Sequence, residues 1–220
     1  MNWSADLRPP SAMTGRDSLM NGTGNSLQEL LASTPWSRLM TAYSRATDFP
    51  EMARKVADGT ADQATFEQIA DDIEQQDTLF QASPYMVDVL IKLLDCPEAD
   101  VAAILSILKT VYVAALDKYL STDHIEEPEI SLEDDLLPPF VDEDDDEELF
   151  EEWDSDNWLY WHQLCLGSIE AARERIESYK VDGPAGDAAL VFFEAAPLGH
   201  DKSQQQVEEA LARLRSAPRT

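Results

Sequence analysis

Apolar residues recur along this chain at intervals of three and four positions, the spacing that puts side chains on one face of a helix. The stripes comprise Leu27, Leu30, Leu31, Ile69, Ile73, Phe80, Val87, Leu90, Ile91, Leu94, Val101, Ile104, Leu105, Leu108, Val111 and Tyr112. Strands have little support, because glycine is sparse and the dipeptides of tight hairpins are nearly absent. The pattern predicts an all-α protein.

Capping residues and prolines indicate where the helices begin. Ser26 can cap a helix that starts at Leu27, because its hydroxyl can accept a free backbone N–H. A first helical turn needs no N–H donor, so it tolerates proline. Four prolines precede apolar-periodic stretches and suit such turns: Pro35, Pro50, Pro84 and Pro97. Beyond residue 157, the sequence predicts one helix over 158–179 and two more over 187–195 and 203–214.

The prolines also form a weak internal repeat. Pro35 and Pro84 are 49 residues apart, and Pro50 and Pro97 are 47 apart. Pro184 and Pro197 repeat the 13-residue separation of Pro84 from Pro97. A period near 47 is typical of stacked helices of the HEAT or armadillo kind. Chance spacing of prolines is the alternative.

Negative charge is concentrated in one segment. The chain has 44 acidic and 16 basic residues, a net charge of −28, and 18 of the 34 residues from 123 to 156 are acidic. No Lys or Arg lies between Lys118 and Arg173. A continuous helix is not expected here, because the segment contains Pro128, Pro138 and Pro139. We therefore expect a HEAT/armadillo-like helical-repeat stack with an inserted acidic, proline-broken loop.

This interpretation divides the chain into four parts. They are a flexible N-terminal tail (1–26), helical repeats (27–120), an acidic insert (121–157) and C-terminal helices packed on the same stack (158–216).

Apolar and aromatic residues are interleaved with the acids of the insert. Negative charge can steer a basic partner, and buried aromatics can then hold it. The predicted partner-binding residues are Asp134, Asp135, Asp142, Glu143, Asp144, Asp145, Asp146, Glu147, Glu148, Phe150, Glu151, Glu152, Trp153, Asp154 and Asp156. In the alternative interpretation, Trp153 and Trp158 fold back on the stack while the acids face water.

The sequence offers little support for catalysis or cofactor binding. No nucleophile elbow, phosphate loop or zinc-protease motif occurs, so an enzyme is not predicted. His124, His162 and His200 lack paired-ligand spacing, and His162 is expected to be a packed or capped side chain. The acidic run has no glycine, which a calcium-binding EF-hand loop needs. Neither a metal nor a cofactor is predicted.

Composition also limits the partners and the compartment. A charge of −28 repels nucleic-acid phosphates and anionic lipid, so neither nucleic acid nor membrane is an expected partner. Cys96 and Cys165 lie in separate apolar stretches and are expected to be packing residues without a disulfide. The N-terminus has no secretion signal, and no apolar run has the length of a membrane span. These features predict a cytoplasmic protein.

Two stretches of the N-terminal half have recognisable patterns. The first runs from Pro35-Trp36 through Ala42-Tyr43-Ser44-Arg45-Ala46 to Asp48-Phe49-Pro50, and the second is Gln75-Gln76-Asp77-Thr78-Leu79-Phe80-Gln81-Ala82-Ser83-Pro84. Both resemble a group of bacterial HEAT-like repeat proteins, and the second is similar to their H-Q-G-[ST]-x-[YF]-x-A-[ST] element. The sequence departs from the group at Ser44 and Asp77, where the group has glycine, and at Gln75, where it has histidine. The resemblance covers residues 34–120.

That resemblance implies an α-solenoid scaffold, and some members of the group look like immunity proteins that neutralise toxins delivered between bacteria. We therefore expect an immunity protein that uses its acidic surface to bind and occlude a cognate toxin with a basic active-site cleft. A helical-repeat adaptor or scaffold is one alternative. A nucleic-acid mimic that inhibits basic proteins is another, and its binding would be strongly weakened by salt.

Overall fold

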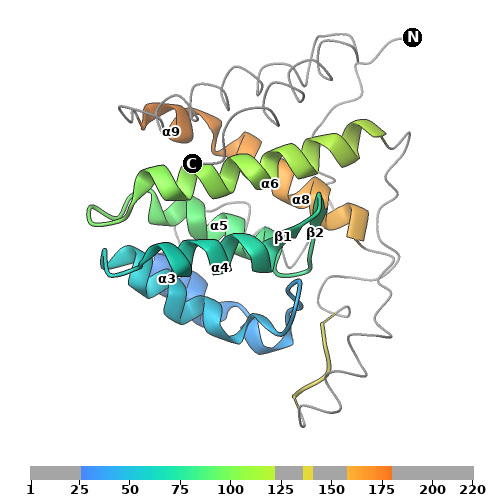
Figure 1. Ribbon diagram of the computed structural model, residues 1–220, viewed down its shortest axis with the longest axis horizontal. Coiled ribbons are helices and arrows are strands. Elements are labelled where there is room, and N and C mark those ends of the chain that lie inside the picture. Colours follow the sequence, from blue (N-terminus) through green and yellow to red (C-terminus); the bar gives the residue numbers. More distant parts are fainter. Residues whose placement is uncertain (1–25, 122–135, 141–157, 180–220) are drawn as a thin grey trace.

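The computed structural model describes residues 26–121, 136–140 and 158–179, and most of these are helical (Figure 1). The α-helices are α2 (Leu27–Ser33), α3 (Phe49–Ala57), α4 (Gln63–Ile73), α5 (Ser83–Leu93), α6 (Val101–Ser121), α8 (Trp158–Ala171) and α9 (Arg173–Ser178). Two 3-10 turns, η1 (Trp36–Arg38) and η2 (Ala46–Asp48), lie between α2 and α3. Strands β1 (Glu74–Gln75) and β2 (Thr78–Leu79) form an antiparallel hairpin. The fold is therefore mostly helical, as predicted, but the sequence did not predict the hairpin. The predicted helices over 187–195 and 203–214 lie outside the described residues.

Several helix starts follow the predicted signals. The Ser26 hydroxyl accepts the Glu29 N–H at 3.2 Å, and the Glu29 carboxylate accepts the Ser26 N–H at 2.7 Å, which completes a capping box. Pro50 and Pro84 lie in the first turns of α3 and α5. The other two prolines differ from the prediction. Pro35 precedes only the 3-10 turn η1, and Pro97 lies in the turn before α6.

The helices pack in pairs around one core. Helix α3 contacts α4, and α5 contacts α6, while α3 also packs on α5 and α4 on α6. Helix α8 lies against both α5 and α6 (Figure 1). Each pair opens with a helix that has proline in its first turn, and those prolines, Pro50 and Pro84, are 34 residues apart. The predicted period near 47 is therefore not the offset between the two packed pairs, because Pro35 and Pro97 do not begin α-helices.

The helix predicted over 158–179 is divided into α8 and α9. Ala172 lies between them, and its N–H is shared between the carbonyls of Ser168 and Ile169, each at 3.1 Å. The i→i−3 bond to Ile169 makes a tighter turn at the end of α8. The α9 segment then contacts the loop after α5. Within the described residues, no helix is long and apolar enough to cross a membrane.

The hairpin turns through two residues with positive φ, Gln76 at 53° and Asp77 at 62°. A two-residue turn of this kind favours glycine or asparagine, because other side chains crowd the backbone when φ is positive. The bacterial group has glycine at the position of Asp77. The prediction missed the hairpin because this sequence has neither favoured residue at the turn.

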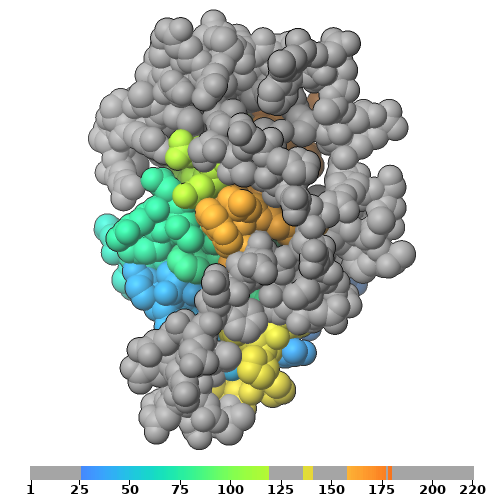
Figure 2. Space-filling view, turned by 90° about the vertical axis from the view of Figure 1, so that its right-hand side faces the viewer, coloured from blue at the N-terminus to red at the C-terminus, as the bar shows by residue number. Residues whose placement is uncertain are grey.

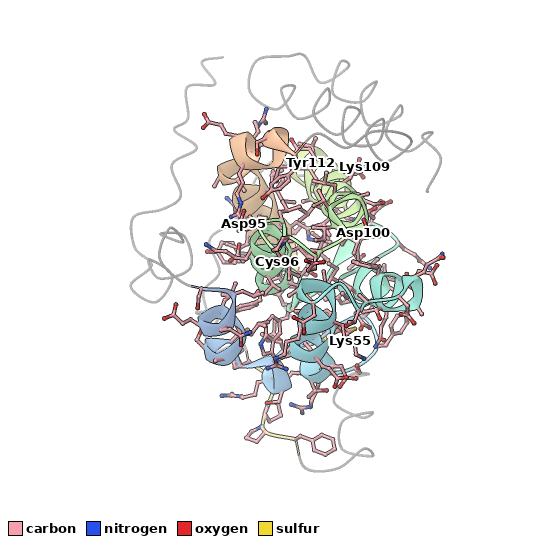
Figure 3. All side chains as sticks on the ribbon, turned by 90° about the vertical axis from the view of Figure 1, so that its left-hand side faces the viewer. Lys55, Asp95, Cys96, Asp100, Lys109 and Tyr112 are labelled. Carbon is pink, nitrogen blue, oxygen red and sulfur yellow. The ribbon has the colours of Figure 1, made fainter. Side chains whose placement is uncertain are left out.

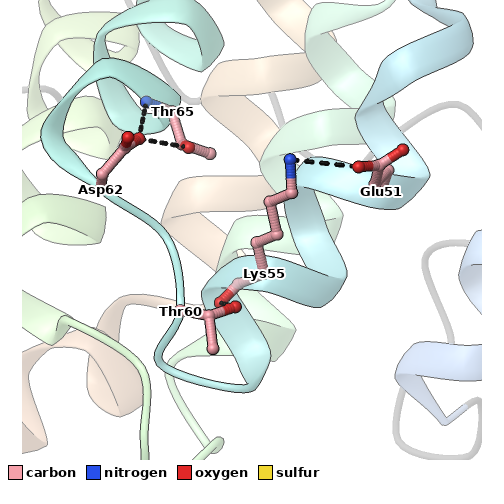
Figure 4. Close-up of polar contacts among 5 residues, drawn as sticks. All are labelled: Glu51, Lys55, Thr60, Asp62 and Thr65. Carbon is pink, nitrogen blue, oxygen red and sulfur yellow. Dashed lines mark hydrogen bonds and ion pairs between the residues drawn. The ribbon is translucent and has the colours of Figure 1, made fainter.

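The loop from α3 to α4 is held by short-range polar contacts (Figure 4). Lys55 pairs with Glu51 within α3 at 3.1 Å, and its carbonyl accepts the Thr60 N–H at 2.9 Å. Asp62 caps α4 by accepting the Thr65 N–H at 2.9 Å and the Thr65 hydroxyl at 2.7 Å. The two hydrogen bonds from Thr65 lower the pKa of the Asp62 carboxyl. Gly59 of this loop has φ +66°, and a Cβ there would lie 2.7 Å from the Glu98 carbonyl oxygen. Glycine is therefore required where this loop meets the loop before α6.

Candidate functional site

Residues 136–140 are the described part of the acidic segment, and they lie against the N-terminal turns of the helical body. Figure 2 shows this short stretch, in yellow, touching the blue N-terminal part of the chain. Leu137 is fully buried, its N–H donates to the Arg38 carbonyl at 3.0 Å, and Arg38 Nε donates to the Leu137 carbonyl at 2.7 Å. This two-way exchange fixes the backbone of the segment at Leu137.

Arg45 makes the second contact with this stretch. Its Nη1 donates to the carbonyls of Ser37 and Pro138, both at 2.7 Å, so the side chain joins η1 to the acidic segment. Its guanidinium carbon also lies 5.8 Å from the centre of the Phe140 ring, a cation–π distance. Arg45 is 7% exposed, whereas Phe140 is 54% exposed. We call residues 136–140, together with Arg38 and Arg45, the anchor.

The loop that carries Arg45 is itself tightly held. Thr41 N–H donates to the Ser44 carbonyl at 2.8 Å, and the Thr41 hydroxyl oxygen accepts the Ser44 N–H at 3.0 Å. Met40 pairs with Arg45 across the loop in an isolated β-bridge. These bonds fix the backbone from which the Arg45 side chain extends toward Pro138.

The same loop joins the two stretches that carry the resemblance to the bacterial group. The side-chain oxygen of the buried Gln81 accepts the Met40 N–H at 2.9 Å, and the Ala82 N–H donates to the Met40 carbonyl at 3.0 Å. Ala42 N–H donates to the Asp72 carbonyl at 2.9 Å, just before the hairpin. The two stretches therefore meet in space beside the anchor.

Trp158 begins α8 directly after the acidic segment. The residue is 37% exposed, and Lys118 Nζ lies 5.3 Å from the centre of its ring, with the His162 ring 5.7 Å away edge-on. Trp158 is therefore neither fully packed on the helical body nor fully turned to solvent. Trp153 lies outside the described residues.

His162 is a packed histidine, as predicted. Its side chain has no exposed surface, Nδ1 lies 2.8 Å from the Trp158 carbonyl, and Nε2 accepts the Leu79 N–H at 3.2 Å. Burial lowers the pKa of His162, and the charge of Lys118 lowers it further. His124 and His200 lie outside the described residues.

Two polar networks join the C-terminal helices to the rest of the helical body. Tyr112 of α6 donates to the Glu170 carboxylate of α8 at 2.7 Å, and Arg173 Nε donates to the same carboxylate at 3.0 Å. Burial and the bond to Glu170 raise the pKa of Tyr112 far above its usual value. In the loop after α5, Asp95 accepts a hydrogen bond from the Tyr179 hydroxyl at 2.7 Å and forms an ion pair with Arg175.

The loop that bears Asp95 also bears Cys96 (Figure 3). Cys96 is partly buried and Cys165 fully buried, and both are free thiols. Burial and the nearby Asp95 raise the pKa of the Cys96 thiol, so at neutral pH it is held in the unreactive thiol form. Both cysteines therefore act as packing residues, as predicted.

All fifteen residues predicted to bind a partner lie outside the described residues. They are Asp134, Asp135 and thirteen residues between 142 and 156. Within the part of the chain that the structure describes, no group of three His, Cys, Asp or Glu side chains could hold a metal ion. Sequence reasoning missed the anchor residues Arg38 and Arg45. One signal was present, because the stretch Leu136-Leu137-Pro138-Pro139-Phe140 has no charge between two acidic runs.

No family model matches the chain, and no curated protein or solved structure matches it either.

Proposed function

We propose that this protein binds a basic partner protein through its acidic segment, and that it is an immunity protein that occludes the basic active-site cleft of a cognate toxin. One observation carries the proposal: the acidic segment is tied to the helical body at its middle, by Leu137 to Arg38 and by Pro138 to Arg45. A spacer that only adds solvated charge needs no such attachment. The expected immunity role comes from the resemblance to the bacterial group.

The anchor also affects the free energy of binding. It divides the stretch between α6 and α8 into two shorter connections, 122–135 and 141–157, whose ends are fixed by described residues. Closing a shorter loop costs less conformational entropy, and restricting a binding loop before it meets its partner reduces the entropy lost on association. The anchor therefore supports a binding role for the acids on both sides of it.

Two exposed aromatic side chains border the more acidic connection. Phe140 precedes it and Trp158 follows it, and each has a cation of this chain near its ring, Arg45 and Lys118 respectively. Aromatic side chains at the edge of a charged contact can add apolar burial that salt does not screen. We expect both rings to contact the partner.

The packing of the helices supports a more specific fold proposal. Helix α3 packs on α5 and α4 packs on α6, and these contacts support a HEAT- or armadillo-like stack of two helix pairs. Such a body would hold the acidic segment rigidly and offer a second contact surface. Inhibition would then be by occlusion in the cytoplasm, with carboxylates in the positions that substrate phosphates would take and with no chemistry on the partner.

The test is co-expression with the protein encoded beside this one, measuring its toxicity alone and its co-purification. Deleting residues 126–156 should abolish protection while leaving the circular-dichroism signal of the helices nearly unchanged. Protection by the deletion variant would contradict the proposal.

A charge-matched pair of variants separates a specific site from general electrostatics. One changes Asp144, Asp145 and Asp146 to Asn, and the other changes Glu67→Gln, Asp71→Asn and Glu98→Gln, so both gain the same charge. We expect the first to weaken partner binding at least about tenfold more than the second, because only its acids would contact the partner. Equal weakening would indicate non-specific attraction, as a nucleic-acid mimic would show.

A further inference from the structure

One buried histidine of α8, His162, is hydrogen-bonded to the β1–β2 hairpin. In a hairpin with a two-residue turn, the pair next to the turn, Gln75 and Thr78, exchanges the backbone hydrogen bonds. The next pair is not hydrogen-bonded, so the Leu79 N–H points away from β1. Leu79 is fully buried, and its N–H donates to His162 Nε2 at 3.2 Å. His162 therefore takes the place of a neighbouring strand for this donor.

The hydrogen bonds at the two ring nitrogens fix the tautomer of His162. The Trp158 carbonyl, 2.8 Å from Nδ1, can only accept, so Nδ1 has the proton. Nε2 must then be bare, because it accepts the Leu79 N–H. Only the neutral ring satisfies both partners.

Burial and one nearby positive charge oppose a second proton on the ring and lower its pKa overall, whereas the backbone carbonyls of Trp158 and Asp77 favour that proton. From α6, Lys118 adds a positive charge close to His162. From the hairpin, the Asp77 carbonyl lies 3.4 Å from Nε2, and the Glu74 carboxylate is engaged with the Asp77 N–H at 2.8 Å. From α8 itself, the ring faces the carbonyl and the side chain of Trp158.

We propose that His162 is a pH-sensitive latch that joins the β1–β2 hairpin to α8. A proton on Nε2 converts an acceptor into a donor, so Nε2 then opposes the Leu79 N–H and its nearest alternative partner is the Asp77 carbonyl. Protonation of Nε2 therefore leaves the buried Leu79 N–H without an acceptor, and this weakens the contact between the hairpin and α8.

The direction of the pH effect follows from the lowered pKa of His162. The opened or unfolded chain has a histidine of ordinary pKa, about 6.5, and binds a proton before the closed form does. The latch is therefore fully stabilising above about pH 6.5 and weakens as the pH falls from there toward the lower pKa of the closed form.

The latch has a consequence for partner binding, and this consequence alone rests on the proposed function. Trp158 is the first described residue after the acidic segment, and its carbonyl is a partner of the His162 ring. Weakening the latch would loosen the start of α8, where the acidic segment ends. Affinity for the basic partner should then decrease at mildly acidic pH.

Hydrogen exchange of the Leu79 amide in the full-length protein tests the latch without a partner. Between about pH 7.5 and about pH 5, after correction for intrinsic exchange, we expect its protection to fall at least about tenfold. In His162→Gln, the side-chain oxygen can accept the Leu79 N–H at any pH, so protection should change less than about threefold. His124→Gln is the matched control and should behave like the wild type.

Constant protection in the wild type, or an equal fall in His162→Gln, would overturn the latch. If His162→Gln does not fold, nitrogen NMR of the wild-type ring decides: a neutral ring with its proton on Nδ1 at neutral pH is expected, and a charged ring or the other tautomer contradicts the proposal. If the protection of the Leu79 amide depends on pH but the affinity for the partner does not, the latch is supported and its link to partner binding is contradicted.

Discussion

At the residue scale, the least favourable backbone geometry in the described chain lies at the hairpin turn. Gln76 and Asp77 both adopt positive φ, where an L-residue costs about 1–2 kcal/mol relative to glycine, and aspartate somewhat less. The Asp77 N–H bond to the Glu74 carboxylate offsets part of this cost. The turn leads into Leu79, whose N–H donates to His162.

Asp77→Gly should therefore stabilise the protein by about 0.5–1 kcal/mol, since glycine adopts φ +62° without crowding. Chemical denaturation with urea measures the change in the free energy of unfolding. The matched control is Asp71→Gly in the exposed part of α4, where the same replacement should destabilise by up to about 1 kcal/mol. A destabilised Asp77→Gly would show that the Asp77 side chain has a role that its geometry does not reveal.

At the scale of elements, the C-terminal helices attach through apolar packing and through polar contacts. Helix α8 packs on α5 and α6 through apolar side chains, and the Tyr112 hydroxyl adds a hydrogen bond to the charged Glu170. The separate helix α9 is joined to the loop after α5 through Asp95. Bonds to a charged group in a half-buried setting contribute more than neutral ones.

Tyr112→Phe should destabilise the protein by about 1–2 kcal/mol, because it removes one of the donors to Glu170 and leaves the aromatic packing unchanged. Thermal unfolding followed by circular dichroism measures the loss. Tyr43→Phe, at a side chain that is 63% exposed, is the matched control and should change stability by less than about 0.5 kcal/mol. Equal effects of the two variants would show that the hydrogen bond from Tyr112 to Glu170 does not stabilise the protein.

At the scale of the whole molecule, net charge acts against the compact state. A chain with a charge of −28 repels itself when folded, and the repulsion acts over the Debye length of the solution. The packed helices of the described residues withstand this repulsion because their buried side chains are mainly apolar and form one continuous core.

Added salt should consequently raise the melting temperature at neutral pH. Going from about 10 mM to about 150 mM NaCl shortens the Debye length from about 30 Å to about 8 Å. We expect a rise of about 2–4 °C, which corresponds to about 1 kcal/mol for a chain of this size. KCl should act like NaCl, and a difference between them would indicate ion binding in place of screening. A melting temperature that falls with salt would show that attractive charge pairs outweigh the repulsion.

The sequence by itself determined most of the helices and several of their starts. The stripes in α5 and α6, the cap at Ser26, and the prolines at 50 and 84 are local signals, read over one to three helical turns. It also predicted that the chain is not helical at Pro138 and Pro139 and that His162 packs, and both hold in the described residues. It did not reveal the hairpin or the break at Ala172, because neither has a strong local signal.

Only the tertiary structure decided which groups these elements bring together. Arg38 and Leu137 are 99 residues apart in the chain, and Leu79 and His162 are 83 apart. In both pairs, one partner is a backbone group, which has the same donors and acceptors at nearly every position and so leaves no mark in the sequence. Folding selects the backbone groups that each side chain meets, and so determines where the acidic segment is attached and what His162 holds.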